Sequence, residues 1–475
     1  MHNNCICNEY RSLVERHLAA VSPRPDTHYW NTITNLTQKF YIYKLERLRF
    51  TDIINRYSGE KRKRYYNAAL YIKEFGLRRR HCKVKMFIKN DRSPVDKLIS
   101  KAPRAIQFRA PEINLMMMQY VKPFEDCYYR ELKYGVVSDS RVIAKGLNWR
   151  ERAQLLVDKA SFFRHPRFVM LDHSSFDNSI TMQMIKTTHR KYRLVFGKQI
   201  NSCFRHQIRN KGRTRMGIRY VVPGTRMSGD ADTALGNTLI NLDAIWGALW
   251  SSNIEKYDML VDGDDAIVII EDGANIDYEQ FARMGLRTKV SETLNIHHAE
   301  FCQSRIVLTP EPVFVRNPYK VISHAPYARR SYQGRYDDWL SAVGMCERAC
   351  NAGVPVLQVF ADQLAQLGTG KPIFDRDLRR RMEGMVVNSR PVVDIARLTF
   401  YEAWNISPPM QLLLEDLLTS QGICDRRNKQ TYFRFSYDRK DDESLQRQRT
   451  WYESSVECSS GSWWCGRTGG YRSIY

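Results

Sequence analysis

The residues of this sequence with the clearest chemical potential are two adjacent carboxylates, Asp264 and Asp265, which follow Gly263. Apolar runs at 259–261 and 266–270 lie on either side of this triplet. The pattern predicts a β-hairpin whose Asp-Gly turn holds both carboxylates at its tip. Adjacent carboxylates repel each other, so a bound cation is their natural neutraliser. The hairpin tip is therefore a candidate metal site.

A second acidic segment lies upstream. The apolar run at 168–171 suits a buried strand, Asp172 closes it, and Asp177 follows where a helix could begin. A carboxylate at a strand end can face a neighbouring hairpin tip. Asp172, Asp264 and Asp265 would then form one cluster of hard oxygen ligands, the type that Mg²⁺ prefers. The alternative is that Asp172 only ends a strand and Asp177 only caps a helix.

The elements that must position these carboxylates include a helix after a glycine-punctuated loop at 224–232. Its pattern runs to about Trp250, and Thr233 and Asn237, four residues apart, share one face of it. Small polar side chains on a helix face can hydrogen-bond a sugar. Alternatively, they are ordinary packing residues beside a turn.

Basic residues alternate with apolar ones in two further segments, 83–92 and 101–111. This alternation could aim several cations at one surface, where Arg binds phosphate bidentately and Lys acts as a point charge. The alternative is a solvated basic face. The four cations concerned are Lys85, Lys89, Arg104 and Arg109.

Three of these segments occur in the order Asp-x4-Asp, Ser-Gly-x3-Thr-x3-Asn and Gly-Asp-Asp. Together they resemble motifs A, B and C of the palm of viral RNA-dependent RNA polymerases of positive-strand RNA viruses, most of all the tombusvirus-like group. The resemblance implies a mixed, helix-rich α+β fold: a right hand with fingers, palm and thumb, whose palm is an antiparallel sheet with flanking helices. It also implies a polymerase that copies a viral RNA genome by two-metal nucleotidyl transfer from ribonucleoside triphosphates.

The resemblance assigns roles to single residues. Asp172 and Asp264 would bridge two Mg²⁺ ions, with Asp265 assisting and with Mn²⁺ able to substitute. Lys289 takes the place of the family's candidate general acid for the leaving pyrophosphate; alternatively, it is an ordinary surface lysine. Ribose selection would fall to Asp177, Ser228, Thr233 and Asn237. The triphosphate would be held by a segment that resembles motif F, through Lys85, Lys89, Arg104 and Arg109.

The likeness covers roughly residues 57–418, with a fingers-like segment at 57–65, motif D- and motif E-like segments at 286–291 and 300–304, and a thumb-like segment at 399–409. The implied organisation is as follows: fingers with an N-terminal extension at 1–165, palm at 166–190, a fingers insertion at 191–222, palm at 223–310, thumb at 311–440, and a tail at 441–475. That tail contains Trp463 and Trp464, and it is expected either to be disordered or to fill the channel.

Composition agrees with a globular protein that has a polyanionic partner. The chain has 475 residues, is 43% hydrophobic and 12% aromatic, and carries a formal net charge of +23. The eleven cysteines form no regular framework, which favours free thiols, and no structural zinc is expected at 297–302. No run of about 20 apolar residues occurs, so no transmembrane helix is expected. The resemblance to positive-strand RNA viruses, which replicate on membranes, implies that other viral or host replication proteins, or a basic surface, would attach the chain to membranes in the host cytoplasm.

Two other functions are considered. A reverse transcriptase shares the palm, but it usually has an aromatic residue at position 262 or 263 and lacks the Ser-Gly loop with Thr233 and Asn237. A non-catalytic basic RNA-binding viral protein would explain the charge and the aromatic residues equally well. It would not explain the intact acidic set.

Overall fold

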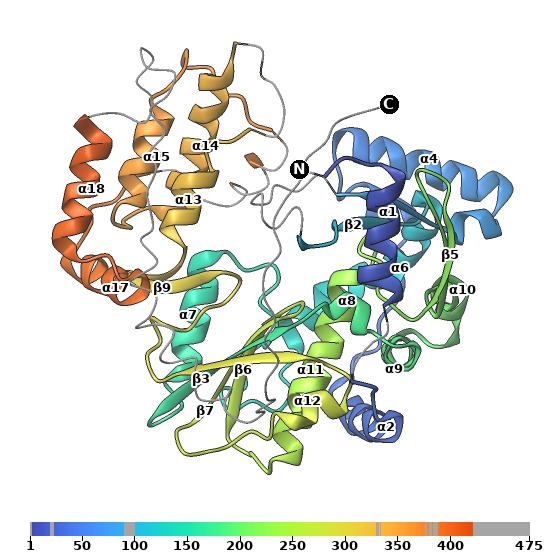
Figure 1. The fold of residues 1–475 in the computed structure, drawn as a ribbon. Helices are drawn as coiled ribbons and strands as arrows, with labels where there is room; N and C mark the ends of the chain where they lie inside the picture. Colours follow the sequence, from blue (N-terminus) through green and yellow to red (C-terminus); the bar gives the residue numbers. More distant parts are fainter. Residues whose placement is uncertain are drawn as a thin grey trace, which may run out of the picture. The chain divides into compact units, whose positions relative to one another are not determined.

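The computed structural model describes residues 2–19, 23–89, 100–328, 332, 334–375, 378–379, 382 and 388–420 (Figure 1). The fold combines helices with mainly antiparallel sheets, which confirms the predicted α+β class. The chain divides into two compact units, residues 1–423 and 424–475. The predicted tail at 441–475 lies outside the described residues.

A four-stranded antiparallel sheet forms the centre of the first unit. Its strand order is β6 (Tyr257–Asp262), β7 (Asp265–Glu271), β3 (Pro166–His173) and β8 (Thr288–Thr293). This order confirms the predicted hairpin and the predicted strand before Asp172. We call it the central sheet.

The central strands are nearly all apolar because both faces of the sheet are covered. Val169 and Val268 lie in the core that contains helix α11 (Thr233–Ser251). Phe168 and Ile269, which point the opposite way, lie in the core that contains α7 (Trp149–Ala160). The sheet therefore lies between two helical layers, and Figure 1 shows α7 and α11 beside it.

A second sheet holds the basic segments. Its order is β2 (Ala105–Phe108), β1 (Val84–Ile88), β4 (Arg209–Thr214) and β5 (Arg219–Pro223). The β1–β4 pair is parallel, and the other two pairs are antiparallel. Two long helices, α4 (Gly59–Phe75) and α6 (Pro111–Glu131), pack against each other next to these segments in the chain.

A hairpin of β9 (Ser304–Thr309) and β10 (Glu311–Arg316) leads into a helical region with its own core. Cys346 and Cys350 are buried there. No described helix is long and apolar enough to cross a membrane. The remaining α-helices are α1 (Ile6–Leu13), α2 (Thr27–Leu36), α3 (Phe50–Ile54), α8 (Phe176–Ser179), α9 (Met182–Phe196), α10 (Asn201–Phe204), α12 (Glu279–Arg283), α13 (Pro318–His324), α14 (Tyr336–Asn351), α15 (Leu357–Ala365), α17 (Asp394–Trp404) and α18 (Pro408–Ser420).

Candidate active site

The β6–β7 turn carries the two adjacent carboxylates. Gly263 has a φ of +73°, which a glycine adopts without strain, and Asp264 and Asp265 are both exposed. Side chains of helix α11 hydrogen-bond to the backbone of this turn. The side-chain amide of Asn241 donates to the carbonyls of Gly263 (3.0 Å) and Asp264 (3.1 Å), and the Gly263 N–H donates to the Thr238 hydroxyl (3.1 Å).

Asp172 lies at the same end of the central sheet as this turn. Leu171 of β3 pairs with Ala266 of β7, so Asp172 and Asp265 are the next residues along these two strands. The pKa of Asp265 is raised to about 6, first by partial desolvation and then by the negative charges of Asp264, Asp262 and Asp172. The three predicted aspartates therefore lie together, although Asp172 and Asp264 are far apart in the chain.

The chemistry of this carboxylate group fits Mg²⁺. Desolvation and then repulsion from the neighbouring carboxylates raise the pKa of Asp265, and a divalent cation would offset that repulsion. Within the described ranges, no three His, Cys, Asp or Glu side chains form a ready-made ligand set. Mg²⁺ usually binds one or two carboxylates and completes its shell with water and substrate phosphates, so an open group is what it requires.

His173 and Asn241 support the site and were not among the predicted site residues. The ring nitrogens of His173 hydrogen-bond to the Thr288 hydroxyl and to the side-chain oxygen of Asn241, both at 2.9 Å. Burial lowers the pKa of His173, which favours its neutral form. One ring thus joins β3, β8 and α11. The position of Asn241 on the same helix face as Asn237 was the only signal in the sequence.

The structure joins two of the four predicted ribose-selecting residues. Asp177 lies in α8, after Ser175 in the left-handed region (φ +55°). The Asn237 amide donates to the Asp177 carboxylate at 2.7 Å and its oxygen accepts from the Arg226 guanidinium at 3.2 Å. Burial raises the pKa of Asp177, whereas the Asn237 hydrogen bond and the Arg226 charge oppose that rise.

The other two predicted ribose-selecting residues, Ser228 and Thr233, lie in the loop before α11 and at the start of α11, and their hydroxyls hydrogen-bond to backbone groups. The Thr233 hydroxyl donates to the carbonyls of Met227 (2.6 Å) and Asp230 (3.0 Å). The hydroxyl of Ser228, which is exposed, accepts from the backbone N–H of Gln107 at 3.2 Å. Ser228 therefore links the loop to strand β2.

Three of the four predicted triphosphate-binding cations share one face of the second sheet. Lys85 pairs with Phe108 across β1 and β2. Lys89 lies four residues after Lys85, and its N–H donates at 2.8 Å to the carbonyl of Arg104, which lies four residues before Phe108. Because side chains alternate along a strand, Lys85, Lys89 and Arg104 point to the same side. Burial raises the pKa of Asp177, and the positive charge of Arg104 opposes that rise, so Arg104 lies close enough to act on this carboxylate.

Arg109 is positioned differently from the prediction. It lies five residues after Arg104, and an odd spacing places it on the opposite face of the strand. Its side chain is 1% exposed and forms an ion pair with Asp230 at 2.9 Å. It also donates to the carbonyl of Cys82 and to the side-chain oxygen of Asn210. In this structure, Arg109 ties the second sheet to the loop before α11 and does not face a nucleotide.

A line of buried polar side chains continues from Arg109 to Asn237, one of the predicted ribose-selecting residues. The Gln207 amide donates to Asp230 (3.0 Å) and to Asp232 (2.6 Å). Arg226 forms an ion pair with Asp232 (3.2 Å) and donates to Asn237. The loop residues that join the two sheets are therefore held by charge as well as by packing. Sequence reasoning did not find this network.

Lys289 lies directly opposite Asp172 across β3 and β8. Paired residues on neighbouring antiparallel strands project from the same face, and Lys289 is exposed. The lysine is thus beside the carboxylate group, where both a proton donor and an ordinary surface lysine would fit.

Asp262, the residue before the Gly-Asp-Asp triplet, is neutralised by two cations. It accepts from Lys145 and, at 2.8 Å, from Arg152 of α7. Arg152 also contacts the sulfur of Cys302 at 3.6 Å. Asp262 therefore fixes the base of the hairpin to α7, and it pairs with Asp265 across β6 and β7.

We expect Asp262→Asn to lower the free energy of unfolding by about 1–3 kcal/mol, because hydrogen bonds between charged groups are lost and two cations keep no carboxylate partner. Its effect on nucleotide incorporation should be smaller than that of losing a metal ligand. Urea denaturation and incorporation assays check this. A loss of activity of about 100-fold at unchanged stability would instead make Asp262 a ligand.

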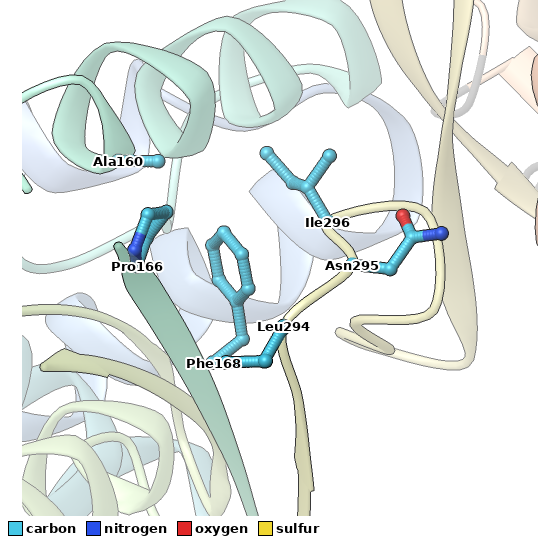
Figure 2. Close-up of a pocket in the computed structure, with 6 residues that line it drawn as sticks. All are labelled: Ala160, Pro166, Phe168, Leu294, Asn295 and Ile296. Atoms are coloured by element: carbon cyan, nitrogen blue, oxygen red, sulfur yellow. The ribbon is translucent and has the colours of Figure 1, made fainter. Parts of the chain in front are cut away.

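An apolar pocket of about 510 Å³ is separate from this site. Figure 2 shows Pro166 and Phe168 of β3 near Ala160 and the loop residues Leu294, Asn295 and Ile296. The pocket lies at the start of β3, whereas Asp172 lies near its end, about 13–20 Å further along at the rise of a strand. It has no carboxylate or cation in its lining, so we do not assign the chemistry to it.

Comparison with known proteins identifies the family of this chain. The model of the family described as viral RNA-dependent RNA polymerase matches residues 1–423. The chain is 30% identical over 408 residues to the RNA-directed RNA polymerase of Groundnut rosette virus (strain MC1), covering 80% of this chain and 48% of that protein. It is 27% identical over 451 residues to the RNA-directed RNA polymerase of Tobacco necrosis virus (strain A), covering 87% of this chain and 61% of that protein. The chain spans about half the length of the curated relatives it matches first. The resemblance found in the sequence is confirmed: the chain belongs to the viral RNA-dependent RNA polymerase family.

Proposed function

We propose that this chain carries the catalytic core of an RNA-directed RNA polymerase that copies a viral RNA genome from ribonucleoside triphosphates. The central sheet with α7 and α11 would be the palm, the second sheet part of the fingers, and the helices after β10 the thumb. The observation that carries the proposal is the grouping of Asp172, Asp264 and Asp265 at one end of β3 and β7.

The reaction is an in-line displacement. The 3′-hydroxyl of the growing strand attacks the α-phosphorus of the incoming nucleotide, and pyrophosphate leaves. Two Mg²⁺ ions held by Asp172 and Asp264, with Asp265 assisting, would lower the pKa of the attacking hydroxyl and neutralise the leaving pyrophosphate. Asn241 and Thr238 keep the hairpin tip in place while this happens.

The remaining site residues orient the nucleotide. Lys85, Lys89 and Arg104 face one side and would hold the triphosphate, and the Asp177–Asn237 pair would bond the ribose. Lys289, which pairs with Asp172 across β3 and β8, would give a proton to the pyrophosphate. Other viral or host replication proteins would hold the chain at membranes in the host cytoplasm.

The direct test is synthesis by the purified chain. It is incubated with an RNA template, four ribonucleotides and either Mg²⁺ or Mn²⁺, with and without a primer, and labelled product is measured. Template-dependent product supports the proposal. Absence of product with either ion, from protein that is folded and binds RNA, contradicts it and favours a non-catalytic RNA-binding protein.

We expect Arg104→Ala to raise the apparent KM for nucleotide by about tenfold or more, since a hydrogen bond to a charged group contributes about 1.5–3 kcal/mol. Affinity for template RNA should change much less. Steady-state kinetics against nucleotide concentration measure the first quantity, and fluorescence anisotropy with labelled template measures the second. An unchanged KM and rate would mean that Arg104 belongs to a solvated basic face and does not bind the triphosphate.

We expect Asn237→Ala to narrow the preference for ribonucleotides over deoxynucleotides. A site built to bond the 2′-hydroxyl leaves polar groups unpaired when a deoxynucleotide binds, at about 1–3 kcal/mol for each group. Without Asn237, the ratio of kcat/KM for ATP to that for dATP should fall by about tenfold, mainly because the ribonucleotide reaction slows. If the ratio stays unchanged in both Asn237→Ala and Asp177→Ala while activity remains measurable, sugar selection lies elsewhere.

A further inference from the structure

Helix α4 presents a basic side that no other described element covers. Its packed side is formed by Tyr65, Ala68, Ala69 and Ile72, at the spacing of one helix face, against a core that includes Leu115 and Met118 of α6. Ala68 alone is fully buried among the 17 residues of the helix. Figure 1 shows α4 running beside α6.

The uncovered side carries cations around an aromatic ring. Arg62, Tyr66, Leu70 and Lys73 follow each other at spacings of four, four and three, so they form one stripe, with Lys63 beside Arg62. All five are exposed, and Tyr66 and Leu70 keep 54% and 48% of their surface accessible. We call this stripe the α4 basic face.

The cations of the α4 basic face form no ion pair within the described part of the chain. Arg62 makes one contact, to the side-chain oxygen of Asn55 at 3.3 Å. Gly76, with a φ of +66°, then ends the helix, and three exposed arginines follow before β1 begins. Positive charge therefore continues from α4 along the chain into β1, which carries Lys85, and on to Lys89 just after this strand.

We propose that the α4 basic face is a docking surface for single-stranded RNA, outside the site of nucleotidyl transfer. Unpaired cations fit a phosphate backbone, and an exposed tyrosine between them offers a base a stacking surface. The stripe is about 16 Å long at the rise of a helix, long enough to follow several nucleotides. This inference deepens the proposed function and rests on it, since the RNA would be the template.

A membrane surface fits this face less well. A helix that lies in a membrane interface needs a broad apolar side to bury among the lipids. The apolar side of α4 is already used against α6, and the exposed apolar residues that remain, Tyr66, Leu70 and Phe75, do not form a broad apolar side. Charge complementarity with a stackable polyanion is the better match.

The test compares two sets of charge-removing variants in RNA binding without nucleotides. Arg62→Gln, Lys63→Gln and Lys73→Gln are combined in one protein. The matched control combines Lys186→Gln, Arg193→Gln and Lys198→Gln, which removes the same charge from exposed positions on and after α9. The probe is a fluorescein-labelled single-stranded RNA of about 20 nucleotides, followed by anisotropy over a range of salt concentrations.

We expect the α4 variant to bind RNA about tenfold more weakly than the control near physiological salt. The slope of log Kd against log salt should fall by about 2, since each phosphate contact on a single strand contributes about 0.7. Tyr66→Ala should weaken binding by about fivefold or more without changing the slope, because stacking is not ionic. Tyr66→Phe should keep wild-type affinity.

Equal effects of the two triple variants would overturn the proposal, because the affinity for RNA would then depend on the total charge of the protein and not on the α4 basic face. Retained RNA binding by the α4 variant, with loss of binding to phosphatidylcholine–phosphatidylserine vesicles, would also overturn it and make this face a membrane contact. Because binding is measured without nucleotides, these outcomes are distinct from a failure to synthesise RNA. Matching circular dichroism of all variants confirms that they fold.

Discussion

Replacing Asp264 with Asn is expected to reduce nucleotide incorporation by about 100-fold or more, since metal ligation at this carboxylate contributes several kcal/mol and each 1.4 kcal/mol is a factor of ten in rate. Asp264 is the exposed tip of the hairpin, and its backbone is held by Asn241 whatever its side chain is. The substitution therefore removes negative charge without disturbing the turn. Primer extension at saturating nucleotide and Mg²⁺ measures the effect.

The control is the same change at Asp416, an exposed residue of α18. Asp416→Asn should leave incorporation within about twofold of wild type, as surface substitutions usually do. Both variants should bind template RNA with nearly wild-type affinity. Asp264→Asn would lose a bound metal ion, but the lysine and arginine side chains that attract RNA remain. Wild-type-like synthesis by Asp264→Asn would falsify the assignment of Asp264 as a metal ligand.

The hairpin that carries Asp264 and Asp265 could be predicted because its signals are local in the sequence. The hairpin is specified by a glycine with a positive φ between two apolar runs, and these signals lie within 12 residues. The contact between Asp177 and Asn237 spans 60 residues and is not a local signal. The resemblance assigned both residues to ribose selection, but it did not predict a contact between them.

The missed features depend on partners that a sequence does not pair. His173 contacts Asn241, 68 residues away, and Asp262 contacts Lys145, 117 residues away. No spacing rule connects such residues, because their proximity is created by the order of strands in the central sheet. The same holds for the buried line from Arg109 to Asn237, which exists only when the second sheet meets the loop before α11.

Arg109 shows where the argument from basic residues was too coarse. Counting cations in the segment at 101–111 treats Arg104 and Arg109 as equivalent, although five residues along a strand reverse the side-chain direction. Applying the two-residue period would have separated the exposed arginine from the buried one. It would not have identified Asp230, which is 121 residues further along the chain, as the partner.

The position of Arg109 leads to the second large effect. Arg109→Met is expected to lower the free energy of unfolding by about 3–5 kcal/mol, because Asp230 would keep a buried charge without its ionic partner. Burial already raises the pKa of Asp230, and the charge of Arg109 opposes this rise. Urea denaturation followed by circular dichroism measures the change. Arg104→Met, at an exposed position on the other face, should change stability by no more than about 0.5 kcal/mol.

A double substitution separates the ion pair from simple loss of packing. Arg109→Met combined with Asp230→Leu removes both charges together, so no buried carboxylate is left unpaired, and it should recover part of the lost stability. If Arg109 instead served the nucleotide, Arg109→Met would raise the KM for nucleoside triphosphate at unchanged stability, as is expected for Arg104. The two arginines therefore test one principle in opposite directions: on a strand, the face a cation occupies decides whether it holds the fold or its ligand.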